Sequence, residues 1–181
     1  ALLSAWVEET GYKGKFFIEP GRYVVAECGV LLGTVHATKF NGENRYVGAD
    51  LGFNVLVRPA MYDSFHDIEI FRDGGEPDTD LVEQSIVGNI CESGDILAKK
   101  RMLPLIKEGD IVAALDAGAY GFVMSSSYNQ RPRAAEVLIT SDGTPLPRPS
   151  SAPDEVVDTA DTTKPMQMMR RALAPAAMVS G

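Results

Sequence analysis

The stretch Gly88–Asp95, with the sequence GNICESGD, follows the apolar run Ser85–Val87 and is the most informative part of this chain. An apolar run that ends in a glycine-bearing turn is typical of a strand followed by a loop. This loop holds a thiol, Cys91, between neighbouring carboxylates. Nearby negative charge keeps a thiol protonated, so Cys91 suits a proton donor better than a nucleophile. On the residues alone, a buried strand cysteine followed by an ordinary turn is the alternative interpretation.

Most of the chain consists of short β-type runs separated by turns. The runs cover residues 30–38, 45–49, 68–72, 81–91, 110–115 and 136–140. The turns contain glycine, at residues 41–42, 73–75, 108–110 and 141–143. Many short strands punctuated by glycine and aspartate are typical of an antiparallel barrel or sandwich. The sequence therefore predicts a mainly β domain over residues 23–145.

The N-terminal segment has a different pattern. Residues 1–9 place Leu3, Trp6 and Val7 on one helical face, and Lys15–Ile18 is β-type. A glycine-bearing loop follows, and residues 23–27 suit a short helix. Helix, turn, strand and loop in this order form the tail of a βα repeat, so we interpret residues 1–22 as the last remnant of a (β/α)₈ barrel. Because no capping residue precedes the first helix, we expect a fragment of a longer protein.

Charge and cysteine content bear on the class of protein. The 181 residues carry a formal net charge of −8, which disfavours nucleic acid and anionic membranes as partners. No apolar run approaches the ~18 residues of a membrane span, and we expect no signal peptide. The cysteines, Cys28 and Cys91, are too few for a disulfide framework and fit no zinc motif. We therefore expect a cytoplasmic protein. His36 and His66 lack a second ligand at metal spacing, so no metal site is predicted.

Cationic side chains mark two further motifs. In Glu19-Pro20-Gly21-Arg22, the glycine permits close approach of the backbone to a ligand. The alternative interpretation of this motif is a plain strand-to-helix turn in which the arginine pairs with a carboxylate. Pro59 disfavours helix at Arg58, so we expect Arg58 in an extended or turn conformation. A guanidinium there can bind a carboxylate, with the Tyr62 phenol adding a further hydrogen bond. The alternative is a surface arginine and a core tyrosine.

Glycines also surround Tyr120, in the segment Asp116–Gly121. They predict a sharp bend that exposes the tyrosine side chain.

Together these motifs resemble those of the diaminopimelate decarboxylases, which are fold-type III decarboxylases that use pyridoxal 5′-phosphate (PLP). That family has a Cys-Glu-Ser-Gly-Asp loop, a Glu-Pro-Gly-Arg turn, an Arg-Pro-x-x-Tyr motif and a Gly-Ala-Tyr segment, and all four occur here. The run Ser125–Arg133 is also similar, and in it Asn129 and Arg131 are expected to pin the loop. The resemblance covers residues 1–140 and maps to the second half of the family. It implies a C-terminal β-barrel or sandwich domain of the alanine racemase/decarboxylase type.

The resemblance also implies a role for each motif. Cys91 protonates the reacting carbon, and Glu92 holds the distal ammonium of a diamino acid substrate. The other implied substrate-binding residues are Arg22, Arg58, Tyr62 and Tyr120. The implied PLP contacts are Glu19, Pro20, Gly21, Arg22 and Tyr120. A homodimer with a shared active site is expected, because in the family the Cys-Glu-Ser-Gly-Asp loop reaches into the partner's site.

The family's Schiff-base lysine has no counterpart here. None of the lysines stands in the family's setting; they are Lys13, Lys15, Lys39, Lys99, Lys100, Lys107 and Lys164. The resemblance therefore implies the C-terminal part of a carboxy-lyase that converts meso-diaminopimelate to L-lysine, and the chain alone is expected to be inactive.

Two alternatives stay open. One is a related decarboxylase acting on ornithine, arginine or carboxynorspermidine, which typically has aspartate at the position of Glu92. The other is a non-catalytic subunit that dimerises with a catalytic partner and lends it the loop. Residues 146–181, rich in Pro, Ser, Thr and Asp, are predicted to form a disordered tail.

Overall fold

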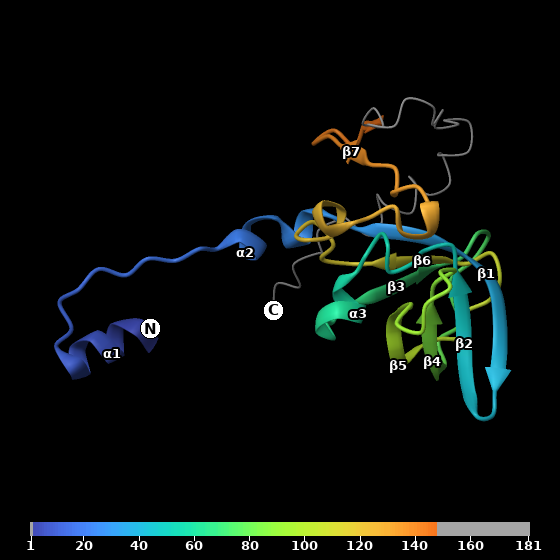
Figure 1. Cartoon of the computed structure of the whole chain (residues 1–181), viewed down its shortest axis with the longest axis horizontal. Coiled ribbons are helices and arrows are strands. Elements are labelled where there is room, and N and C mark those ends of the chain that lie inside the picture. Colours follow the sequence, from blue (N-terminus) through green and yellow to red (C-terminus); the bar gives the residue numbers. More distant parts are fainter. Residues whose placement is uncertain (1, 148–181) are drawn as a thin grey trace.

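A computed structural model describes residues 2–147 of the chain (Figure 1). Its centre is a six-stranded sheet in the order β3-β6-β1-β2-β4-β5. Neighbouring strands are antiparallel except β2 and β4, which are parallel. The strand bounds are β1 Leu31–Asn41, β2 Asn44–Ala49, β3 Ile68–Phe71, β4 Leu81–Val87, β5 Ile96–Pro104 and β6 Ile111–Ala114. The predicted mainly β fold is confirmed.

The two edge strands of this sheet approach each other, so the sheet forms a nearly closed barrel. Arg101 on β5 donates to the His66 carbonyl oxygen at 3.2 Å, two residues before β3 begins. Its guanidinium also lies 3.4 Å from the Asp67 carboxylate and 3.9 Å from the centroid of the Phe65 ring. These contacts span the gap between β5 and β3, so Arg101 links the two edge strands of the barrel.

The core lies inside this curved sheet. Along β2, Arg45, Val47 and Ala49 are buried while the residues between them are partly exposed, as the two-residue period of a strand requires. The core side chains come from every strand and from the loops after β2 and β5; they are Val35, Val47, Ala49, Leu51, Leu56, Ile68, Ile70, Ile86, Leu97, Ala98, Leu103, Ile106, Val112 and Ala114.

The predicted turns join these strands as expected. Gly42 and Gly109 have φ angles of +60° and +89°, a region that glycine enters without steric cost. Gly42 reverses the chain between β1 and β2, and Gly109 does so just before β6. A two-stranded sheet, β7 (Val137–Ile139) and β8 (Pro145–Pro147), follows the main sheet.

The N-terminal arm, residues 2–20, runs away from the sheet (Figure 1). It begins with the helix α1, Leu2–Thr10, in which no residue is buried. The strand predicted over Lys15–Ile18 is wrong, because the chain there is irregular and exposed. A strand needs a neighbour for its backbone hydrogen bonds, and no strand within residues 2–147 pairs with these residues. The short helices α2 (Gly21–Val25) and η1 (Ala26–Cys28) then lead into the sheet, where a helix was predicted.

Three elements differ from the sequence prediction. The strand predicted over residues 81–91 ends at Val87, and the strand β5 was not predicted. Arg58 is the first residue of a helix, α3 (Arg58–Tyr62), so the extended conformation predicted for it is wrong. Proline is tolerated in the first turn of a helix because its missing N–H has no partner there.

The division into residues 1–22, 23–145 and 146–181 stays a prediction. Strand β8 extends two residues past the boundary at 145, and the remainder of the predicted tail lies outside the described residues. Between residues 2 and 147, no helix has the length and apolar character needed to cross a membrane.

Candidate functional site

Three segments far apart in the sequence bring arginine and tyrosine side chains together. The Tyr120 ring follows β6, and its centroid lies 5.9 Å from the guanidinium carbon of Arg22 in α2. The guanidinium carbon of Arg58 in α3 lies 5.6 Å from the same centroid and 5.8 Å from that of the Tyr62 ring. Four of the predicted site residues thus form one cluster, which we call the arginine–tyrosine cluster.

The backbone around Tyr120 explains how the ring reaches this position. Tyr120 itself has a φ angle of +59°. The preceding residues dock on η1, because the Ala117 N–H donates to the carbonyl of Gly29, just after η1, at 2.8 Å and the Gly118 N–H donates to the carbonyl of Ala26, in η1, at 3.0 Å. A β-carbon at Gly118 would lie 2.0 Å from the Val25 carbonyl oxygen, so only glycine permits this approach. The predicted sharp bend is therefore present.

Arg58 is buried, with 6% of its surface exposed. Its Nη2 atom donates to the Ser64 hydroxyl at 3.0 Å. Within residues 2–147 no carboxylate forms an ion pair with it. A buried guanidinium without an anionic partner is costly, so its position favours an anionic ligand. The alternative interpretation of Arg58 as a surface arginine is wrong.

Arg22 and its neighbours lie at the exposed edge of the cluster. Arg22 forms no ion pair within the described part of the chain. A β-carbon at Gly21 would lie 3.2 Å from the Tyr120 hydroxyl, which places the backbone of this turn beside that phenol. The Gly21 N–H donates to the Glu19 carbonyl at 2.9 Å, and Glu19 and Pro20 are exposed. The roles predicted for these residues stay predictions.

The thiol loop, Gly88–Asp95, turns back sharply after β4. The Gly88 N–H donates to the Asp95 carbonyl at 3.0 Å, and the Asp95 N–H to the Glu92 carbonyl at 3.1 Å. Residues 91–94 are exposed, so the interpretation of Cys91 as a buried strand cysteine is wrong. The side chains of Cys91 and Glu92 make no hydrogen bond or ion pair with residues 2–147, and neither joins the arginine–tyrosine cluster.

The segment that follows the cluster is held by residues that the sequence did not single out. Asn54 is buried, and its Nδ2 atom lies 3.4 Å from the carbonyl oxygens of Ser126 and Pro132. Asn129 is exposed and Arg131 is partly buried, and neither side chain makes a hydrogen bond with the described residues, so their role in pinning this loop stays a prediction. Within residues 2–147 the loop is held by the Asn54 amide, which lies more than seventy residues earlier.

Neither histidine belongs to the arginine–tyrosine cluster. His66 is buried and its Nδ1 atom lies 2.8 Å from the Leu115 carbonyl oxygen. His36 is exposed on β1. Among residues 2–147, no group of three His, Cys, Asp or Glu side chains is arranged to hold a metal ion.

Shifted pKa values occur in other parts of the molecule. Hydrogen bonds to Asp110 raise the pKa of Arg72 above its usual range. A hydrogen bond from Lys107, and a second from Arg72, lower the pKa of Asp78. Hydrogen bonds from Thr140 and Thr144 lower the pKa of Asp142 to about 2. Arg72, Asp78 and Asp142 lie outside the arginine–tyrosine cluster, in or beside turns and strand ends.

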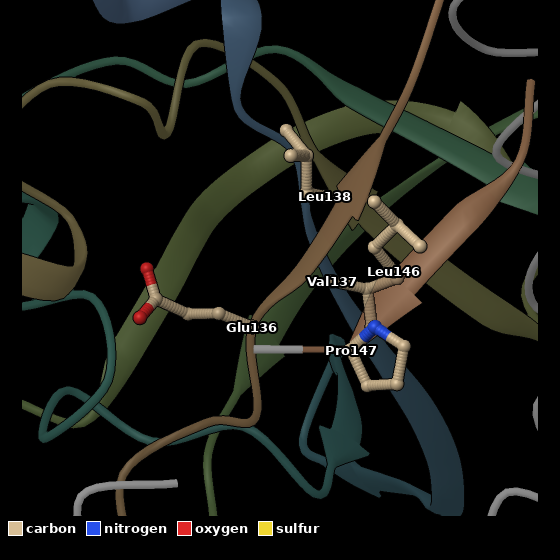
Figure 2. Close-up of a pocket in the computed structure, with 5 residues that line it drawn as sticks. All are labelled: Glu136, Val137, Leu138, Leu146 and Pro147. Atoms are coloured by element: carbon tan, nitrogen blue, oxygen red, sulfur yellow. The ribbon is translucent and has the colours of Figure 1, made fainter. Parts of the chain in front are cut away.

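A pocket at the β7–β8 hairpin contains none of the predicted site residues. Its walls are Glu136, Val137, Leu138, Leu146 and Pro147. Figure 2 shows the Glu136 carboxylate directed away from Leu146 and Pro147, so the hollow itself is apolar.

Comparisons with known proteins agree with the fold of the sheet. A family model described as pyridoxal-dependent decarboxylase, C-terminal sheet domain, matches residues 22–118. A diaminopimelate decarboxylase of Archaeoglobus fulgidus is 50% identical over 129 residues, which are 71% of this chain and 30% of that protein.

Solved structures give the same result. A crystal structure of a diaminopimelate decarboxylase matches with a TM-score of 0.68 and 40% identity, over 78% of this chain and 35% of its own. The enzyme from Helicobacter pylori, in complex with L-lysine, matches with a TM-score of 0.59 and 38% identity, over 66% of this chain and 28% of its own. This chain therefore spans about a third of the length of the relatives that it matches.

Proposed function

Because this chain belongs to the pyridoxal-dependent decarboxylase family, as its C-terminal sheet domain, we propose that it forms one wall of a diaminopimelate decarboxylase active site. The reaction is the removal of one carboxylate of meso-diaminopimelate to give L-lysine. The single observation that supports a site here is the buried guanidinium of Arg58, which has no anionic partner in the described chain.

The arginine–tyrosine cluster fits a substrate carboxylate. A guanidinium can form two parallel hydrogen bonds with a carboxylate, and Arg58 is fixed in place by Ser64 and two aromatic rings. Tyr62, 58% exposed, can add its hydroxyl from the solvent side. We propose that Arg58 and Tyr62 orient the carboxylate and that Arg22 approaches it from across the Tyr120 ring.

The same wall fits the phosphate end of PLP. Gly21 lacks a side chain where its backbone faces the Tyr120 hydroxyl, and Arg22 supplies a positive charge at that point. We propose that Glu19, Pro20 and Gly21 form the turn that receives the phosphate, with Arg22 and Tyr120 as donors. When bound, PLP would withdraw electrons from the substrate Cα atom and so weaken its bond to the carboxylate.

The thiol loop supplies the remaining groups. Cys91 and Glu92 are exposed and take no part in the contacts of the arginine–tyrosine cluster, as expected of side chains that serve another subunit. We propose a homodimer in which the Cys91 thiol donates a proton to the substrate carbon of the partner's site. The Glu92 carboxylate would there accept a hydrogen bond from the distal ammonium, which selects a diamino acid.

The chain by itself is proposed to be inactive, because the lysine that anchors PLP is supplied by another part of the complete enzyme. Incubation of the chain with one equivalent of PLP, followed by borohydride, tests this: no single lysine of the chain should be labelled to about one equivalent. We also propose a cytoplasmic location, which the two free cysteines support.

A complete enzyme that contains this chain provides the main test. It should release CO₂ from meso-diaminopimelate and leave ornithine, arginine and carboxynorspermidine unreacted. Glu92→Ala should lower kcat/KM about tenfold to a hundredfold, because the substrate ammonium loses its charged partner. Glu83→Ala, which removes an exposed carboxylate from β4, is the matched control. Turnover of ornithine without turnover of diaminopimelate would reject this function in favour of the related decarboxylases.

A further inference from the structure

Asp95, the last residue of the thiol loop, is the one charged side chain of that loop that is buried, with 4% of its surface exposed. We propose that Asp95 is a positioning residue, which fixes the thiol loop on Phe53 and so sets where Cys91 and Glu92 lie relative to α3. The relevance of this to catalysis rests on the proposed function, whereas the positioning itself can be measured without any reaction.

The Asp95 carboxylate binds two backbone N–H groups from different segments. Its Oδ1 atom accepts the Phe53 N–H at 2.6 Å, and its Oδ2 atom accepts the Ile90 N–H at 2.6 Å. No cation in the described chain forms an ion pair with it. Such short bonds to a charged acceptor are among the stronger hydrogen bonds in proteins, so each oxygen holds one segment firmly.

Gly88 makes room for this carboxylate at the start of the loop. A β-carbon at Gly88 would lie 2.3 Å and 2.4 Å from the two carboxylate oxygens and 2.4 Å from the Leu51 carbonyl oxygen. A side chain at this position would therefore force the carboxylate or the backbone to move. The first and last residues of the thiol loop are thus adapted to each other.

The segment to which Asp95 attaches, Phe53–Asn54, is itself tied to the rest of the candidate site. The Phe53 ring packs on Tyr128 with 5.0 Å between centroids. The Ser126 N–H donates to the Asn54 carbonyl at 2.8 Å, in addition to the contacts of the Asn54 side chain. Four residues after Asn54, α3 begins at Arg58. Through Phe53, Asp95 therefore connects the proposed proton donor to the helix that holds the proposed carboxylate-binding arginine.

Burial excludes a direct role for Asp95 in the reaction, because both oxygens are occupied by backbone groups. Its effect must pass through the position of the loop. Loss of the carboxylate leaves the Ile90 and Phe53 N–H groups without partners, and the exposed residues 91–94 then lose their attachment.

Hydrogen exchange of this chain tests the positioning. In Asp95→Ala, exchange at the Phe53 and Ile90 amides should become about tenfold to a hundredfold faster, whereas amides of β1 and β6 keep their protection. Asp95→Asn should give a smaller effect, because one carbonyl oxygen remains. Gly88→Ala should loosen the same two amides with the carboxylate still present. Asp50→Asn is the matched control, since its carboxylate accepts the Thr34 N–H at 2.7 Å on another part of the sheet. Unchanged exchange at Phe53 and Ile90 in Asp95→Ala would overturn the proposal.

The complete enzyme separates positioning from simple stability. In Asp95→Asn, we expect kcat to fall and KM for meso-diaminopimelate to rise per folded, PLP-loaded enzyme, because Cys91 and Glu92 move together. A role in stability alone would lower the melting temperature but leave both constants unchanged, and that result would reject the catalytic relevance of Asp95. Should wild-type enzyme not act on diaminopimelate at all, the proposed function fails, while the exchange experiment still decides whether Asp95 holds the loop.

Discussion

The N-terminal arm and the six-stranded sheet contain the same kinds of apolar side chain but bury them very differently. Phe17 and Ile18 in the arm are 86% and 81% exposed, whereas Ile86 on β4 is 0% exposed. In the arm, Trp6, Tyr12 and Phe16 pack on one another, with ring centroids 5.1–6.0 Å apart. In the sheet, four of the six strands, β6, β1, β2 and β4, are paired with a strand on each side. An apolar sequence therefore forms regular, buried structure only where other segments supply a surface to pack against.

This contrast agrees with the family assignment. In the arm, the apolar residues that the sequence assigns to a (β/α)₈ barrel have no barrel beside them in the described chain. The strands of the sheet bury their apolar side chains against one another. The arm leaves its apolar side chains exposed, where other polypeptide can cover them. The arginine–tyrosine cluster lies at the junction of the two regions, since Arg22 belongs to α2 and Arg58 to the sheet domain.

The largest expected difference in stability is between two isoleucine-to-alanine variants, one in the sheet and one in the arm. Ile86→Ala should destabilise the chain by about 2–5 kcal/mol, because it leaves a cavity in a closely packed core. Ile18→Ala should change the free energy of unfolding by no more than about 0.5 kcal/mol, because its side chain is already in water. Urea unfolding followed by circular dichroism measures both values. Equal effects would show that the arm is packed in solution and would contradict the difference in burial between the arm and the sheet.

A second pair of substitutions concerns the carboxylates that hold the sheet domain. Asp110 is buried, and it accepts two hydrogen bonds from the Arg72 guanidinium, both at 2.8 Å, and one from the Lys107 N–H at 2.7 Å. Asp110→Ala should cost about 3 kcal/mol, the lower end for a buried ion pair, because Arg72 keeps some contact with water. Asp78→Ala removes the outer, partly exposed partner of Arg72 and should have a much smaller effect on the melting temperature. If the two variants melt together, the buried carboxylate does not stabilise the sheet as we infer.

The sequence predicted the sheet better than it predicted the parts that depend on distant contacts. Two-residue periodicity and glycine turns located five of the six strands of the main sheet. Strand β5 was missed because Lys99, Lys100 and Arg101 interrupt its apolar pattern. Lys100 has a φ angle of +47°, and its N–H donates to the Ser85 hydroxyl at 2.9 Å, so an irregularity in the pairing with β4 accommodates these cations.

The candidate site shows the same limit. The motif around Tyr120 predicted its bend, because glycine spacing is a local signal. The part played by Asp95 had no local signal: its partner Phe53 is forty-two residues away, and carboxylate next to glycine is common in ordinary turns. Burial of Arg58 also depended on the fold, because the rings beside it come from a segment more than fifty residues later as well as from its own helix.

The junction between the arm and the sheet can be loosened by one methyl group. Gly118→Ala places a β-carbon 2.0 Å from the Val25 carbonyl oxygen, so the Asp116–Gly121 segment must move away from α2. We expect a loss of about 1–3 kcal/mol and faster hydrogen exchange at Ala117, whose N–H bonds to Gly29. Gly75→Ala is the matched control, because no atom lies within 4 Å of its added β-carbon. Equal exchange at Ala117 in the two variants would mean that the junction is not held by this close approach.

The smallest expected effect concerns the β7–β8 hairpin, which lies outside both regions. The Asp142 carboxylate accepts hydrogen bonds from the Thr140 hydroxyl and from the Thr144 N–H, and they lower its pKa from 3.8 to about 2. A carboxyl group with a lowered pKa stabilises the folded form above the unfolded value, and this contribution is lost as the pH falls from about 4 to 2. The hairpin amides should therefore lose protection in that range while the sheet core keeps it, and Asp142→Asn should remove the pH dependence. An Asp142 side chain that titrates near 3.8 by NMR would show that the turn is open in solution.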